Sequence, residues 1–366
     1  MRYVEIACDE SGFSGSNLLD PSTPVITHAA VDLGVAEAVE LVARVRANSR
    51  HPNSEYKSTQ MLRRRSAVEC LLESLEGRAS VHLTDKRFFV VNRMVDFLLG
   101  EPTYAAGTSL AVDLRGVALR LHREGPEVFG TANWYAVLTS FAAMMRTKRH
   151  RVVNRPAVDR YYEALRRARG GHEVIELLCG TRARAEEVFT TLLDERSSVP
   201  PPLEPLLTAL VDTTLHWSAG GRVVDIIHDE QSALTPHRVN QIRILLAEAR
   251  VKAGVSAAVV EAGVDAAEEV AGGEAASARG LLREPVLEVR VAPARPLRGF
   301  GLVDSRGDAR VQVADLLAGV GRHLATEELR GRGDPGLTGL LRAYVVEGSL
   351  WADEGSGRRL SLGGQV

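Results

Sequence analysis

The sequence is poor in cysteine and contains no long apolar run. Its three cysteines are odd in number, far apart and set among apolar residues (Cys8, Cys70 and Cys179). This pattern predicts core thiols in a reducing compartment and excludes disulfides and zinc sites. No apolar stretch approaches the length that crosses a membrane, and the first residues already read as a strand, with no signal peptide before it. We therefore expect a cytoplasmic protein with no membrane partner.

The chain also lacks an excess of charge of either sign. Its 366 residues carry a formal net charge of −2, which excludes a wholly basic nucleic-acid-binding protein and restricts such a role to a local patch. Lysine is scarce: only four of the 45 basic residues are lysines, namely Lys57, Lys86, Lys148 and Lys252. The length allows two domains, or one domain with a large insertion.

Apolar periodicity predicts an α/β core in two parts. Strands are predicted at 3–8, 25–33, 80–84, 222–228, 286–291 and 300–303. Helices are predicted at 35–47, 60–76, 87–99, 108–123, 131–147, 157–169, 182–195, 203–215, 236–252, 309–329 and 337–346. The two core parts are therefore 1–99 and 218–330, with a helical insertion at 100–217 and a C-terminal helix and tail at 331–366.

Asp315 is the most unusual acid in the sequence. It lies in Val311-Gln312-Val313-Ala314-Asp315-Leu316-Leu317-Ala318-Gly319, where nearly every neighbour is apolar or small. Such a stretch is typical of a helix that is packed on most of its circumference. Because an isolated buried charge is very costly, this carboxylate needs a hydrogen bond, an arginine such as Arg322, or a metal ion.

Two further aspartates each follow an apolar strand. Strand 3–8 runs into Asp9-Glu10-Ser11-Gly12, and strand 222–228 runs into Asp229. If these strands are parallel neighbours, Asp9 and Asp229 leave the same sheet edge about 4.8 Å apart. That spacing suits carboxylates that hold divalent ions for in-line phosphoryl displacement, with Asp315 completing the cluster. Hard oxygen ligands, without a Cys or His pair at metal spacing, favour Mg²⁺ or Mn²⁺ over Zn²⁺.

Each of these acids also has an ordinary explanation. Asp-Glu-Ser-Gly after a strand is good turn chemistry, and Asp229 precedes a similar turn. Asp315 is compatible with a buried polar contact to the backbone or to an arginine. The three acids together favour a metal centre more strongly than any one of them does.

Four short motifs are spread over the predicted core. They are Tyr3…Asp9-Glu10-Ser11-Gly12, Glu55-Tyr56-Lys57-Ser58, Asp85-Lys86, and Val303-Asp304-Ser305 followed by the 311–319 segment. As a set they resemble an uncharacterised bacterial family, domain of unknown function 3800 (DUF3800). The likeness covers about residues 1–99 and 220–325 and leaves out the insertion. It implies a ribonuclease H-like mixed β-sheet flanked by helices, and a metal-dependent nuclease or related phosphoryl-transfer site.

The resemblance assigns roles by position. It implies that Asp9, Asp229 and Asp315 are metal ligands, that Glu55 is the fourth ligand, and that Lys57 contacts a substrate phosphate or the leaving oxygen. Taken alone, Glu55 and Lys57 read as an exposed, solvated charge pair. Residues with secondary roles, for which turn or cap roles are equally compatible, are Glu10, Ser11, Lys86, Asp304, Ser305 and Gln312.

A basic segment lies within the predicted insertion. Residues 146–169 carry nine Arg and Lys residues against two acids, with Tyr161 and Tyr162 interleaved. Such a segment suits a phosphate backbone with stacked bases, but it is equally a solvated helical face. The candidates for nucleic-acid contact are Arg63, Arg64, Arg146, Lys148, Arg149 and Arg151. Aromatic residues of the insertion, such as Trp134 and Tyr135, are core residues or the surface of a homodimer.

The sequence therefore predicts a Mg²⁺- or Mn²⁺-dependent nuclease acting on DNA or RNA, in which metal-bound water attacks a phosphodiester. The alternative is a catalytically inactive ribonuclease H-like module that binds nucleic acid or a protein partner, with the acids in structural roles. A third possibility is a hydrolase of nucleotides or other small phosphoesters.

Overall fold

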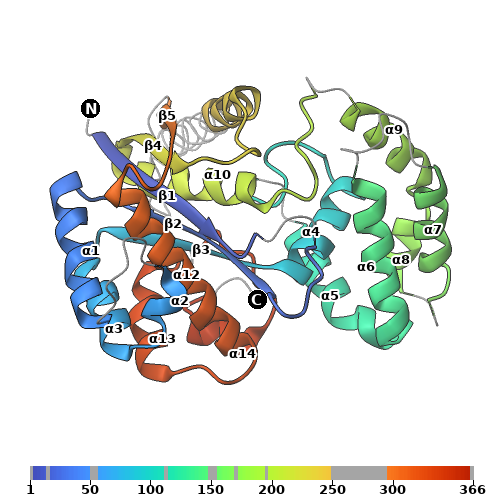
Figure 1. Cartoon of the computed structure of the whole chain (residues 1–366). Coiled ribbons are helices and arrows are strands. Elements are labelled where there is room, and N and C mark those ends of the chain that lie inside the picture. Colours follow the sequence, from blue (N-terminus) through green and yellow to red (C-terminus); the bar gives the residue numbers. More distant parts are fainter. Residues whose placement is uncertain are drawn as a thin grey trace, which may run out of the picture.

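The computed structural model describes residues 3–13, 17–49, 57–110, 114–146, 155–168, 172–193, 197–248 and 295–362. A five-stranded mixed sheet has helices on both faces, and a further group of helices stands at one end of it (Figure 1). The strands are β1 (Tyr3–Ser11), β2 (Val25–Val31), β3 (Ala79–Asp85), β4 (Val223–Asp229) and β5 (Leu297–Val303). The molecule is thus an α/β protein, as predicted.

The sheet has the order β3-β2-β1-β4-β5. β1 and β4 are parallel, as are β4 and β5, whereas β2 runs antiparallel to both β1 and β3. In the central pair Tyr3 lies opposite Val223, and Cys8 lies opposite His228. Strands β1 and β4 thus meet the condition set for the aspartates in the sequence, since they are parallel neighbours, and Asp9 and Asp229 follow in register at the same edge.

Helices cover the two faces of the sheet through separate cores. On one face, α1 (Val35–Ser49), α3 (Arg65–Ser74) and α12 (Ala309–Leu329) pack on strand residues such as Ala7 and Ala29. On the other, α10 (Pro205–Ser218) and the helical residues 236–248 pack on Val4, Ile6 and Cys8. The short elements α2 (Ser58–Met61), α13 (Pro335–Leu341) and α14 (Glu354–Arg359) lie on the α12 side (Figure 1).

The remaining helices form what we call the helical unit. It consists of α4 (Lys86–Leu98), α5 (Arg115–Phe129), α6 (Thr131–Met145), α7 (Arg155–Leu165), α8 (Glu173–Cys179) and α9 (Arg182–Leu192), which share one core. Leu18 and Leu19, from the β1–β2 loop, belong to the same core. The observed packing therefore differs from the predicted insertion at both of its ends. Helix α4, which precedes residues 100–217, packs with the helical unit, and α10, at the end of this range, packs on the sheet.

Several local predictions differ from the structure. The helix predicted at 60–76 is two helices, because Arg64 is extended (φ −135°, ψ 104°) and interrupts the helical turns between α2 and α3. The helix predicted at 108–123 begins at Arg115 and continues through Pro126. The short helices α8 and α14 were not predicted, since six or seven residues are too few for a periodic pattern. The strand predicted at 286–291 lies outside the described residues.

The three cysteines lie in different environments. Cys8 is buried and Cys70 is half-buried, but Cys179 is exposed at the end of α8, so the prediction of a core thiol was wrong there. None of the helices in the described ranges is long and apolar enough to cross a membrane.

Candidate metal centre

Asp9, Asp229 and Asp315 meet on the α12 side of the sheet. Ala7 and Ile227 lie two residues before the two strand aspartates and both belong to the core under α12. Because side chains alternate along a strand, Asp9 and Asp229 point to that same face. The charge of Asp315, on α12, is close enough to raise the pKa of Asp9. Three acids that are far apart in the sequence are therefore neighbours.

The environment of Asp9 disfavours its charged form. Its side chain is 6% exposed, and burial is the main cause that raises its pKa to about 9. The charges of Glu10, Asp315 and Asp229 raise it further, while a 2.7 Å hydrogen bond from the Glu10 amide to Asp9 Oδ1 opposes them. No arginine or lysine is among the main influences on this pKa. The surroundings of Asp9 therefore disfavour its charged form, which a bound divalent cation would stabilise.

Glu10 is a second buried acid, on the opposite face of β1. Gln231 donates a hydrogen bond to Glu10 Oε1, and His228 Nε2 lies 3.8 Å from Oε2. Burial, followed by the charge of Asp229, raises the pKa of Glu10 to about 7. Its Oε2 is buried and accepts no hydrogen bond within the described part of the chain. Glu10 thus adds to the negative charge at the end of β1 from the α10 side.

The loop after β5 connects Asp229 to α12. The amide of Ser305 donates to Asp229 Oδ1 at 2.9 Å, and Gln312 Nε2 donates to the Ser305 carbonyl at 3.1 Å. Gln312 therefore contacts Asp229 only through the backbone of Ser305, and both residues position this carboxylate. Asp304 is exposed and accepts from the Arg306 amide, so the turn role considered for it is the one observed.

Lys57 is held near the acids by the packing of α2 on α12. It precedes α2 as its N-terminal cap residue and is exposed, while Ser58 is buried against Gly319. Gly319 is four residues after Asp315 and so lies on the same face of α12. The α2 segment thus covers the turn of α12 that follows Asp315. Glu55, the predicted fourth ligand, lies outside the described residues.

We expect Gly319→Ala to destabilise the protein by about 1–2 kcal/mol. A Cβ at this position would overlap Ser58 Oγ, and overpacking of about 1–3 kcal/mol exceeds the helix-propensity gain of about 1 kcal/mol. Urea denaturation measures the change. Gly339→Ala, in α13 and facing open space, is the control and should be neutral or stabilising. Adding Ser58→Gly should restore stability to Gly319→Ala, and an equal loss in the double variant would contradict this packing.

The remaining predicted residues are divided between the two ends of the molecule. Ser11 Oγ accepts a 3.0 Å hydrogen bond from Arg322 Nε at the end of β1. Arg63 and Arg64 are exposed between α2 and α3, on the same side as Lys57. Arg146 is exposed at the end of α6, in the helical unit, which Figure 1 shows on the opposite side of the molecule from α1 and α3. Lys148, Arg149 and Arg151 lie outside the described residues.

The donor chemistry of the site fits a hard cation. Asp9 is buried, Asp229 and Asp315 are half-buried, and the charges of Asp229 and Asp315 both act on Asp9. Such carboxylate oxygens are the ligands that Mg²⁺ and Mn²⁺ prefer. In the described ranges, however, no group of three or more His, Cys, Asp or Glu side chains is arranged so that it could hold a metal ion. A metal would therefore require the three aspartates to draw closer, or a further ligand such as Glu55.

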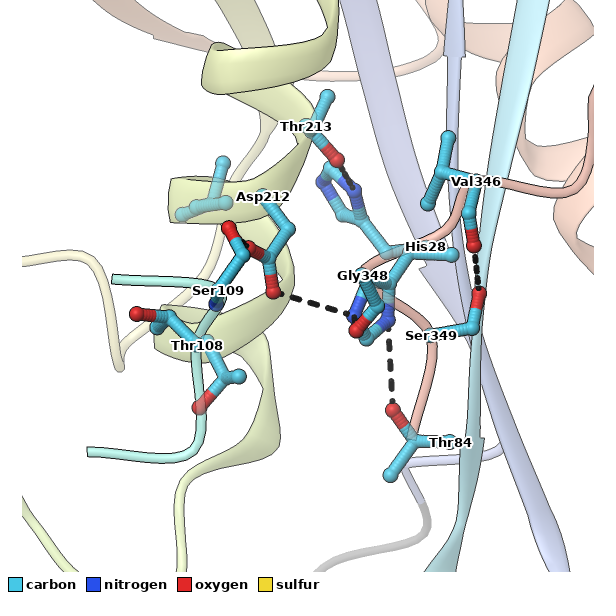
Figure 2. Close-up of polar contacts among 12 residues, drawn as sticks. His28, Thr84, Thr108, Ser109, Asp212, Thr213, Val346, Gly348 and Ser349 are labelled. Atoms are coloured by element: carbon cyan, nitrogen blue, oxygen red, sulfur yellow. Dashed lines mark hydrogen bonds and ion pairs between the residues drawn. The ribbon is translucent and has the colours of Figure 1, made fainter. Parts of the chain in front are cut away.

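A buried polar cluster on the other face of the sheet was not predicted (Figure 2). His28 Nδ1 lies 3.0 Å from Thr213 Oγ1, and His82 Nε2 lies 3.6 Å from Asp212 Oδ2. Ser109 Oγ donates to the other oxygen of Asp212 at 2.7 Å. Ser109 thus donates to a carboxylate and is not hydrogen-bonded to His28 or His82, so the serine–histidine pair of a nucleophilic site is not formed by these residues. The cluster instead joins α10 to β2 and β3 through polar contacts, and it leaves His28 Nε2 and Asp212 Oδ2 without a hydrogen bond among the described residues.

No signal in the sequence identifies this cluster. His28 and His82 are directly opposite each other on β2 and β3, but isolated histidines in apolar strands carry no motif. His28 also stacks on His228, with ring centroids 5.4 Å apart. Burial lowers the pKa of His28 well below its usual range, so it is neutral at physiological pH.

Comparisons with protein-family models, with curated proteins and with solved structures return no match for this chain. The resemblance drawn from the sequence motifs therefore stays a hypothesis that depends on the residues described above.

Proposed function

We propose that the protein is a Mg²⁺- or Mn²⁺-dependent nuclease with a ribonuclease H-like core. The observation that carries the proposal is the convergence of Asp9, Asp229 and Asp315 at one edge of a parallel strand pair, with the pKa of Asp9 raised to about 9 by burial and by the other acids. A buried carboxylate whose charged form is disfavoured by neighbouring acids marks a candidate site for a cation.

The sheet supports the fold part of the proposal. A ribonuclease H-like core has a mixed five-stranded sheet with its first strand in the centre beside the fourth, and only the second strand antiparallel. The order β3-β2-β1-β4-β5, with β2 alone reversed, is compatible with that arrangement. It also explains why the acids at the ends of β1 and β4 are neighbours.

Each residue of the site would have its own role. Asp9, Asp229 and Asp315 would hold the ion, and Ser305 and Gln312 would fix the orientation of Asp229. A bound Mg²⁺ or Mn²⁺ would activate a water molecule and neutralise charge that develops on the phosphate. Lys57, held beside α12 through Ser58, would contact a phosphate oxygen.

Cleavage assays on labelled DNA and RNA oligonucleotides test the proposal. We expect cleavage by the wild-type protein with Mg²⁺ or Mn²⁺, and none with EDTA. Asp9→Ala and Asp315→Ala should each reduce the rate by about 10²-fold or more, the order of loss seen when an organised electrostatic contact is removed. Asp225→Ala is the control, because Asp225 lies on the same strand as Asp229 but pairs with Arg298. Unchanged metal-dependent cleavage in both site variants would reject the assignment.

A second candidate is an inactive module that binds nucleic acid or a protein partner. It is favoured by the exposed Arg63 and Arg64 between α2 and α3, which can contact nucleic acid or an acidic partner without a metal. Calorimetric titration with Mn²⁺ separates the two functions, since the module should show no stoichiometric divalent site and no turnover.

A further inference from the structure

A pocket lies at the same edge of the sheet as Asp9. It has a volume of about 520 Å³ and is enclosed by the β1–β2 loop, the starts of α4 and α14, and the end of α12. Lys86, Arg330, His122 and Asp353 are among its lining residues. β3 is parallel to β1 and ends at Asp85, so the pocket opens about two strand spacings, or about 10 Å, from the end of β1.

Lys86 is a buried cation in the wall of this pocket. The residue is 2% exposed, and its Nζ donates a 3.0 Å hydrogen bond to Thr23 Oγ1. Burial lowers the pKa of this amine to about 8, and the charge of Asp20, which forms no close ion pair with it within the described ranges, opposes that shift. A buried ammonium group whose hydrogen bond goes to a hydroxyl is incompletely compensated, and an anionic ligand in the pocket would compensate it further.

The acids that line the pocket already have their own donors. Asp85 accepts from the amides of Arg87 and Phe88, and Asp353 accepts from the amide and hydroxyl of Ser356. Asp20 and Glu354 are likewise engaged, the first by Ser22 and the second by Arg123 at 2.7 Å. Asp20 attracts Lys86 through its charge, but each of these acids is already engaged by other groups, so the pocket retains a space in which an anion can contact the amine.

Arg322 lies between the pocket and the acids. Its Nε donates to Ser11 Oγ, two residues after Asp9, and its charge acts on Lys86. We propose that the pocket binds a phosphate group through Lys86, with Arg322 lining the path from the pocket to the aspartates. The identity of this phosphate rests on the proposed function. For a nuclease, the phosphate belongs to the nucleic-acid backbone next to the cleaved phosphodiester.

Binding without metal tests this proposal apart from catalysis. In EDTA, anisotropy of a labelled single-stranded oligonucleotide and calorimetry with pyrophosphate are compared for wild type, Lys86→Met, Lys86→Arg and Arg78→Met. Arg78 is the control, because it is exposed, pairs with Glu37 and lies at the opposite end of β3. We expect Lys86→Met to lower the affinity for both ligands about tenfold. It should also reduce the salt dependence of oligonucleotide binding by the equivalent of about one phosphate contact. Lys86→Arg should retain most of the affinity, and Arg78→Met should match the wild type.

Each outcome decides one of the two proposals. Equal binding by Lys86→Met and wild type, or no pyrophosphate binding by the wild type, would overturn the phosphate site. Pyrophosphate binding that depends on Lys86, without any oligonucleotide binding, would support the site, assign it to a small phosphate ligand and count against the nuclease.

Lysine labelling gives a second readout that needs no substitution. Pyridoxal phosphate, a phosphate-bearing aldehyde, condenses with a lysine amine with loss of water, and borohydride reduces the imine to a stable amine. With only four lysines in the sequence, peptide mapping resolves every site. We expect Lys86 to be labelled before Lys57, Lys148 and Lys252, and pyrophosphate to protect it. Labelling of all four at equal rates would overturn the proposal.

Discussion

Replacing Asp9 with asparagine should stabilise the metal-free protein by about 2–4 kcal/mol at pH 7. The pKa of Asp9 is about 9 in the folded protein, against 3.8 for an ordinary aspartate. Between these values the unfolded chain has lost a proton that the native state keeps, so stability falls as pH rises, by about 1.4 kcal/mol per unit. Below about pH 4 and above about pH 9 this slope disappears. Asparagine removes the titration and keeps the shape of the side chain.

Urea denaturation in EDTA at pH 5, 7 and 9 measures this effect. The free energy of unfolding of the wild type should fall across the series, and that of Asp9→Asn should fall much less. Glu10, with a pKa near 7, contributes a smaller slope to both proteins. Asp334→Asn, at an exposed helix cap, is the control for loss of an acid. Parallel curves for wild type and Asp9→Asn would show that Asp9 is ionised in the native state.

Divalent ions should offset most of the stability difference. Mn²⁺ binds ionised carboxylates, so at 100 times its dissociation constant it should stabilise the wild type by about 2.7 kcal/mol, with release of protons. Asp9→Asn should gain little from Mn²⁺. An equal gain in both proteins would place the metal away from Asp9.

Arg93→Met should cost about 3–5 kcal/mol of stability, the usual penalty for removing one partner of a buried ion pair. Arg93 is 2% exposed and lies 3.9 Å from Asp96 Oδ2. Its guanidinium donates to the Ala106 carbonyl and, at 2.8 Å, to Thr208 Oγ1. Because Arg93 is on α4 and Thr208 is on α10, the side chain joins the helical unit to the helix that covers the sheet.

Thermal and urea unfolding of Arg93→Met check this expectation. Arg120→Met, an exposed arginine of the helical unit paired with Glu124, is the matched control and should change stability by less than about 1 kcal/mol. We also expect the unfolding of Arg93→Met to become less cooperative, since the two parts lose a buried contact. Asn92 Nδ2 also donates a 2.8 Å hydrogen bond to Asp96 Oδ2, so a loss no greater than that of the control would mean that Asn92 alone satisfies this carboxylate.

The parts of the site that could be predicted are those determined by local pattern. An apolar strand before Asp9 and another before Asp229 indicated parallel neighbours, and an acid in an otherwise apolar helix identified Asp315. Lys86 was noted for its rarity, but its burial depends on the β1–β2 loop, the end of α12 and the start of α14, which no local pattern brings together. Likewise α10 has the apolar residues of an insertion helix, and only its contacts with β2 and β4 show that it belongs to the sheet.

The central position of β1 has a consequence for incomplete chains. Its partner β4 is more than two hundred residues further along the sequence, so a nascent or proteolysed chain that ends before Val223 leaves the backbone groups on one side of β1 unpaired. Val4, Ile6 and Cys8 would then lie on an exposed strand edge, which is a template for association with other chains. Truncated products should therefore aggregate, and they would hold only one of the three aspartates.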